Sequence, residues 1–228
     1  MWIIFLNGIA IFLGGILGCK FKKYVSKNMS NSIIKVVALS IVVISLKEAL
    51  NYRNGMLNLA YLVIGVIIGE GIDLDNKLKK TGNYIQSKLT RGEDGIAKGF
   101  VVSTIMFCVG SMAILGPLEI ALKNNYEILS IKSIMDGISA IIFSATYGIG
   151  VVFSGIVVIL YEGLIYVLGS GIAALVTPDI IQDISSVGGV VLLALGITVI
   201  FGERYIKVSN MLPAIFLPII YSLILRLI

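Results

Sequence analysis

The sequence predicts an all-α polytopic membrane protein with about eight membrane segments, in which two inverted three-span repeats flank two central spans rich in glycine and serine. Composition is the first reason: 57% of the residues are hydrophobic and 14% are charged, against roughly 45–50% and 25% in soluble domains. The second is that long apolar runs recur from one end of the chain to the other. The third is a weak internal similarity between the two ends of the chain. We therefore expect a single membrane domain over residues 1–228.

The apolar runs define the candidate spans, several of which have about 17 residues, near the short limit for a membrane helix. In chain order they are roughly residues 2–18, 32–48, 56–72, 97–115, 131–148, 151–169, 186–202 and 210–227. The first run has no basic n-region and no A-x-A cleavage pattern, so we interpret it as a retained span. Neither the fourth run nor the 141–172 stretch has a clean polar break, so broken or re-entrant segments are an alternative there.

Charged residues in the loops indicate the orientation. Lysine and arginine cluster after the first, third and seventh spans, whereas the loop after the sixth span has Asp179 and Asp183 and no basic residue. Positive charge is retained on the cytoplasmic side, which predicts that both termini lie outside. The net charge of +5 is therefore interpreted as a topology signal, and we expect no nucleic-acid partner.

Residues 73–94 form the longest polar stretch. Leu74, Leu78, Ile85 and Leu89 recur at helical spacing, which predicts an amphipathic helix at the cytoplasmic surface with its lysines toward lipid headgroups. A docking segment for a soluble partner is the alternative.

The repeat divides the chain into four parts: residues 1–72 (repeat one), 73–94, 95–150 (the central spans) and 151–228 (repeat two). LNGIAIFLGGILG (6–18) aligns with YEGLIYVLGSGIA (161–173), so that glycine meets glycine twice. The loop that follows is basic in the first copy and acidic in the second. Loops of opposite charge predict copies of opposite orientation.

In this alignment Glu162 faces Asn7, and a glycine follows each of them. One hypothesis is a polar pair that lines a binding site at the repeat interface near the bilayer midplane. A carboxylate there could exchange a proton or bind a cation. The alternative is coincidence, with each residue hydrogen-bonded to a neighbouring helix.

The central spans carry small and hydroxyl residues that are candidate ligands for a polar solute. They include Gly110, Ser111, Ser139, Ser144 and Thr146. Hydroxyls and free backbone carbonyls can coordinate a dehydrated ion. The same residues can instead allow close helix packing, with each hydroxyl bonded to its own helix. Pro117 is expected to end the fourth span.

Further charged candidates flank these spans. Lys132 and Asp136 are spaced to pair on one helix face, which we expect near the outer interface. Asp136 is a primary candidate, and Glu70, Glu119 and Lys132 are secondary ones.

The sequence points away from catalysis. It has no histidine, only two cysteines, and no P-loop, nucleophile elbow, metalloprotease helix or Rossmann fingerprint. We therefore expect no enzyme, no catalytic residue, no metal site and no cofactor.

Several segments resemble a known family. FCVGSMAILGPLE (107–119), KSIMDGISAIIFSATYGIGVVFS (132–154), SSVGGVVLLALGI (185–197) and KVSNMLPAIFLP (207–218) are similar to bacterial integral membrane proteins grouped as domain of unknown function 554. The resemblance covers almost the whole chain. It implies a bacterial inner-membrane location and transport as the expected activity, and it does not indicate a substrate.

Two functions follow from these observations. The first is a secondary transporter or channel for a small ion or polar solute, in the lipid bilayer and as a homodimer. The second is a non-transporting scaffold or sensor that binds a partner through the basic 73–94 segment.

Overall fold

The computed structural model describes residues 2–24, 26–89, 96–172, 175–201 and 206–227. The elements in chain order are α1 (Trp2–Phe21), η1 (Lys22–Tyr24), α2 (Lys27–Leu50), α3 (Gly55–Ile72), α4 (Leu74–Leu89), α5 (Ile96–Val109), α6 (Met112–Lys123), α7 (Glu127–Tyr147), α8 (Gly150–Ile172), α9 (Pro178–Phe201), η3 (Val208–Phe216) and α10 (Leu217–Leu227). No strand occurs in these ranges, so the predicted all-α class is confirmed for them.

Six of the described helical segments are long and apolar enough to cross a membrane, or up to seven if the bent α5–α6 pair is one span. The predicted count of eight is therefore not confirmed. The predicted span 32–48 lies in α2, which is not one of these six or seven. The chain is nevertheless a multi-pass membrane protein in its architecture.

Local signals in the sequence set several helix ends. Ser26 precedes α2 and accepts a hydrogen bond from the Met29 amide at 3.2 Å. Asn54 caps α3 in the same way, through the amides of residues 56 and 57. Such side chains supply partners to first-turn N–H groups that have none within the helix. Gly148 separates α7 from α8 with a φ of 82°, which glycine adopts readily, so the 141–172 run is two helices joined by a tight turn.

The fourth predicted span is broken, but not where expected. α5 ends at Val109 and α6 begins at Met112, with a bend of 52° at the break between them. The expectation that Pro117 ends the helix is wrong, because Pro117 lies inside α6. It lacks one backbone N–H, and membrane helices tolerate proline where neighbouring groups compensate.

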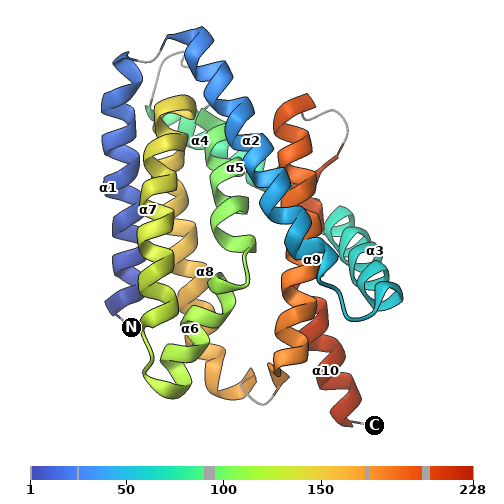
Figure 1. Cartoon of the computed structure of the whole chain (residues 1–228). Helices are drawn as coiled ribbons and strands as arrows, with labels where there is room; N and C mark the ends of the chain where they lie inside the picture. The colour runs from blue at the N-terminus through green and yellow to red at the C-terminus, as the bar shows by residue number, and fades with distance from the viewer. Residues whose placement is uncertain (1, 25, 90–95, 173–174, 202–205, 228) are drawn as a thin grey trace.

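The helices form two adjoining groups (Figure 1). α1, α7 and α8 stand beside α5 and α6, and α2 and α9 stand beside α3, η3 and α10. The most extensive contacts are α1 with α7, α2 with α9, α3 with η3 and α1 with α8. Both chain ends lie at the same end of the molecule in this view.

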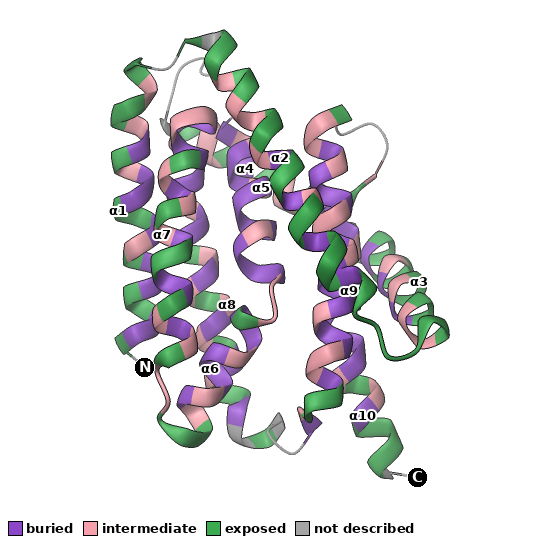
Figure 2. Ribbon diagram, in the orientation of Figure 1, coloured by how far each residue is buried: buried purple, intermediate pink, exposed green. Residues whose placement is uncertain are grey.

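Glycine brings α1 and α7 together. A Cβ added to Gly14 would overlap the Gly137 carbonyl oxygen, and one added to Gly18 would overlap that of Ile141. Backbones that approach this closely are typical of helix pairs in membranes. Exposed apolar side chains follow the outer faces of α1, α2 and α3 (Figure 2), as expected for surfaces that contact lipid.

The polar 73–94 stretch forms the predicted helix, α4, over Leu74–Leu89; residues 90–94 lie outside the described part. Leu74, Leu78 and Ile85 are half-buried where α4 meets α5 and η3. The predicted amphipathic helix is thus found, with its apolar side turned toward the protein.

Candidate functional site

The two polar residues that the sequence alignment placed opposite each other are in contact inside the helix bundle. The Asn7 Nδ2 group on α1 donates a hydrogen bond of 2.8 Å to Glu162 Oε1 on α8. Both residues have an exposed fraction of 0%. Gly8 makes this contact possible, because a Cβ there would overlap the Ile159 side chain of α8. The polar pair therefore lies at the crossing of α1 and α8.

Two charged residues of α7 join the pair. Lys132 Nζ donates to Asp136 Oδ2 and also lies 3.6 Å from Glu162 Oε1. Asn7 Nδ2 lies 3.3 Å from the same Asp136 oxygen. The predicted pairing of Lys132 with Asp136 is confirmed. Lys132 and Asp136 are only 5% and 8% exposed and face the buried pair. Their expected place near the outer interface of the membrane stays a prediction.

These four residues, Asn7, Lys132, Asp136 and Glu162, form what we call the buried cluster. With its ionisable groups charged it carries one positive and two negative charges, so one carboxylate has no counter-charge within it. Two further atoms, Asn7 Oδ1 and Glu162 Oε2, are buried without a hydrogen-bond partner among the residues that the structure describes. Both atoms accept hydrogen bonds, and such groups are rarely left unpaired. The buried cluster is therefore short of donors and of positive charge.

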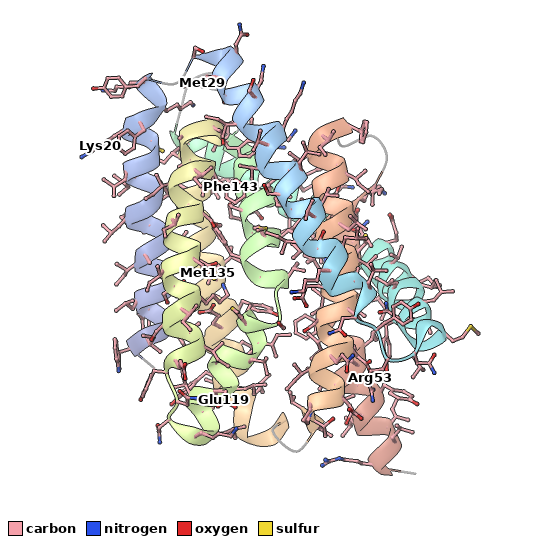
Figure 3. The ribbon with its side chains drawn as sticks, viewed as in Figure 1. Lys20, Met29, Arg53, Glu119, Met135 and Phe143 are labelled. Atoms are coloured by element: carbon pink, nitrogen blue, oxygen red, sulfur yellow. The ribbon has the colours of Figure 1, made fainter. Side chains whose placement is uncertain are left out.

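A cavity of about 210 Å³ adjoins the buried cluster, between α2, α7, α9 and the α5–α6 break. Lys132 and Asp136 line it, as do Gly110 and Ser111 at the break and Ser139 on α7. Met135, labelled on α7 in Figure 3, also lines the cavity and shows where along α7 the cavity lies. Asn7 and Glu162 are not among the lining residues, so they lie behind the Lys132–Asp136 pair.

Sequence reasoning missed the opposite wall of the cavity. Glu48 of α2 and Ser185, Gly188 and Gly189 of α9 line it. Glu48 was visible as an acidic residue at the end of an apolar run, but no spacing linked it to the central spans. The glycines allow close packing of α9 on α2, since a Cβ at Gly189 would overlap the backbone around Ala49.

Four other predicted site residues lie outside both the buried cluster and the cavity lining. Thr146 bonds to carbonyl groups of its own helix, and Ser144 packs against the glycines of α1. Glu70 pairs with Lys207 at 3.0 Å, and Glu119 pairs with Lys123 at 2.7 Å. Figure 3 shows Glu119 at the far end of α6, so its role there is local pairing at a helix end.

A second polar cluster connects the α2–α3 loop to the start of α9. Arg53 donates from Nε and Nη2 to the two carboxylate oxygens of Asp183 at 3.0 and 2.6 Å, and its Nη1 lies 2.7 Å from Asp179. Figure 3 shows Arg53 beside α9. The hydrogen bond to Asp183 raises the pKa of the Arg53 guanidinium, so this residue keeps its charge throughout the pH range of the folded protein. The contact joins the α2–α3 loop to the first turns of α9.

A family model described as Protein of unknown function (DUF554) matches residues 3–223. The chain belongs to the DUF554 family. This confirms the resemblance noted in the sequence.

Two relatives of this DUF554 protein are similar to it over almost their whole length. One is "Uncharacterized membrane protein YdfK" of Bacillus subtilis (strain 168), 27% identical over 93% of this chain and 91% of the relative. Another is "Uncharacterized protein YqgA" of Escherichia coli (strain K12), 27% identical over 93% and 92%. No solved structure matches the chain significantly. The comparisons support a membrane protein and leave its activity to be inferred from the structure.

Proposed function

We propose that this DUF554 protein is a secondary transporter or channel for a small ion or polar solute, with its binding site at the repeat interface near the bilayer midplane. One observation carries the proposal: a buried cluster of ionisable residues borders a cavity at a broken helix. Charged residues inside membrane segments are costly and usually functional. Broken helices at membrane depth are typical of places where backbone groups face a cavity.

The pairing of helices supports two inverted repeats. α1 packs against α8, α2 against α9 and α3 against η3, and each pair joins one segment of repeat one to its aligned segment in repeat two. The α1–α2 and α8–α9 connections lie at opposite ends of the molecule (Figure 1). Asn7 and Glu162, which bond across the α1–α8 contact, are 155 residues apart, and the aligned glycines have the same separation. Contacts between equivalent segments are expected along a pseudo-two-fold axis.

The proposed orientation follows from the basic loops. We propose a bacterial inner-membrane location with both termini outside, because the loops after α1, after α3 and after α9 carry the lysine and arginine clusters. Figure 1 shows both chain ends at the opposite end of the molecule from the α1–α2 loop. The exposed apolar faces would contact lipid, and we propose a homodimer as the assembled form.

The experiment is solute flux in proteoliposomes that contain the purified protein. The panel holds alkali cations, halide and oxyanions, and small metabolites, each compared with protein-free vesicles. We expect flux of one class that falls at least tenfold in Asp136→Asn and is retained in Glu127→Gln, an exposed carboxylate on the same helix. The absence of flux for every member of the panel would refute transport.

A second candidate function concerns α4. Its lysines at 77, 80 and 88 are exposed while its apolar side is half-buried against the protein, so a positive surface faces outward. That surface fits either anionic lipid headgroups or an acidic partner, the latter being the scaffold alternative. Replacing these three lysines by glutamine distinguishes the candidates. Loss of a co-purifying partner with flux unchanged supports the scaffold, whereas unchanged co-purification removes it.

A further inference from the structure

The buried cluster offers acceptors to a ligand and few donors. Asn7 uses its Nδ2 group toward two carboxylates, which leaves its Oδ1 atom as an unpaired acceptor. Glu162 accepts the Asn7 hydrogen bond at Oε1 and faces the Lys132 ammonium there, which leaves Oε2 without a partner in the described part of the chain. Since both residues are 0% exposed, water at the surface cannot satisfy these atoms. A ligand that completes this site must bring hydrogen-bond donors or positive charge.

The charge around the cavity has the same sign. Among the charged residues that line it, Glu48 and Asp136 are acidic and Lys132 is basic. Glu162 lies behind Lys132 and adds another carboxylate. The fixed charge at the inner end of the cavity is therefore negative, and a low-dielectric wall strengthens its attraction for a cation. An anion would meet two carboxylates and only one ammonium, which is already engaged by Asp136.

The Lys132 ammonium indicates the size and charge of a group that fits between Asp136 and Glu162. Its ammonium group lies between Asp136 and Glu162, in contact with the first and 3.6 Å from the second. A primary ammonium is a compact point charge on a flexible stem, so it can leave such a position by rotation of its side chain. The uncompensated charge of the buried cluster is a single negative charge, which one monovalent cation balances.

We propose that the buried cluster is a binding site for a small monovalent cation, and that the Lys132 ammonium is a tethered counter-ion which the incoming cation displaces from Glu162. The inference rests on the proposed function for its location and adds the substrate class. The cation enters through the cavity and reaches the Asp136 carboxylate. Glu162 and the Asn7 carbonyl oxygen complete its coordination. Ser139 and Gly110, which line the cavity, would replace part of its hydration shell on the way.

Cation-dependent thermal stability of the full-length protein in detergent tests this proposal. The melting temperature is measured at constant ionic strength with sodium, potassium or N-methylglucamine as the cation and one common anion. We expect a saturable rise with one alkali cation of about 5–10 °C at roughly one hundred times its Kd. A second series holds the cation constant and exchanges the anion, and should leave the melting temperature unchanged. Equal melting temperatures in all cations, or a rise that follows the anion, would overturn the proposal.

Three variants locate the effect. Glu162→Gln should remove the cation-dependent rise, while Glu127→Gln, on the outer surface, should retain it. Lys132→Gln removes the tethered competitor, so it should lower the melting temperature in N-methylglucamine and bind the alkali cation more tightly, by at least tenfold. If Lys132→Gln does not fold, the wild type and Glu162→Gln still decide the question. A rise that persists unchanged in Glu162→Gln rejects the site.

The binding assay needs no flux, so the two proposals fail separately. Saturable cation binding without flux of any solute would refute transport and leave the cation site intact. Flux of an anion or a neutral solute, with no cation-dependent stabilisation, would support transport and overturn the cation site.

Discussion

Charge balance in the buried cluster predicts that two substitutions of similar size have very different effects on stability: Lys132→Gln should destabilise the protein strongly, and Glu162→Gln should be nearly neutral. Lys132→Gln removes the only ammonium and leaves Asp136 and Glu162 buried together. At 3.6 Å the Lys132–Glu162 attraction alone is about 5 kcal/mol for an effective dielectric constant of roughly 20. Removing one partner of a buried ion pair typically lowers the free energy of unfolding by about 3–5 kcal/mol. We expect a loss in this range.

Glu162→Gln should be nearly neutral. The glutamine oxygen still accepts the bond from Asn7, and Lys132 still pairs with Asp136. The variant loses the attraction to Lys132, but it also removes a buried carboxylate whose desolvation costs several kcal/mol and whose charge repels Asp136. These contributions offset one another, so the free energy of unfolding should stay within about 1 kcal/mol of the wild type.

The assay is unfolding in detergent, with N-methylglucamine as the sole buffer cation so that ligand binding does not contribute. For a chain of this length, about 1 kcal/mol corresponds to roughly 2–4 °C in melting temperature, so the two variants should differ by roughly 10 °C. Equal destabilisation by both substitutions would refute the reasoning, because it would show that Glu162 is fully compensated in the folded protein. A more stable Lys132→Gln variant would refute it as well.

Three other predictions concern packing, the loop and the surface. Gly18→Ala places a Cβ against the backbone of α7 and should lower the melting temperature, whereas Gly71→Ala meets nothing within 4 Å and should leave it unchanged or raise it. Arg53→Ala should lower the free energy of unfolding by about 2–4 kcal/mol, because Asp183 stays buried without its partner. Arg53→Lys should recover part of this loss. Equal losses in the two variants would contradict a role for the bidentate contact. Glutamine at the three exposed lysines of α4 should weaken binding to anionic vesicles by roughly 1 kcal/mol per lysine, measured with the protein held in nanodiscs of neutral lipid, and a loss that is unaffected by salt would argue against a headgroup contact.

Much of the architecture could be predicted from the sequence. Hydropathy identifies the membrane class because a span must be apolar along its whole length, and the family match confirms the resemblance in the central and C-terminal segments. Asn7 and Glu162 could be paired because the proposed repeat alignment places them opposite each other, and they prove to be hydrogen-bonded. The amphipathic 73–94 segment was predictable for the same reason as the spans, since its pattern is local.

Other features required the tertiary structure. Lys132 and Asp136 could be paired by spacing, but their burial against Glu162 depends on how α7 is rotated toward α1 and α8. The wall of the cavity formed by Glu48 and Ser185 comes from two helices far apart in the chain. The break after Val109, in place of the expected stop at Pro117, depends on what surrounds each backbone group.

The difference between what the sequence predicts and what the tertiary structure decides has a physical cause. Membrane helices are apolar on nearly every side, so their sequence encodes that they cross the bilayer and says little about which side faces a neighbour. That choice is made by small residues, here the glycines at the α1–α7 and α2–α9 contacts, which act only when two backbones meet. The sequence alone therefore determined the all-α membrane class and pointed to the polar pair, and the packing of α7 against that pair determined that a buried ammonium and two carboxylates share one site.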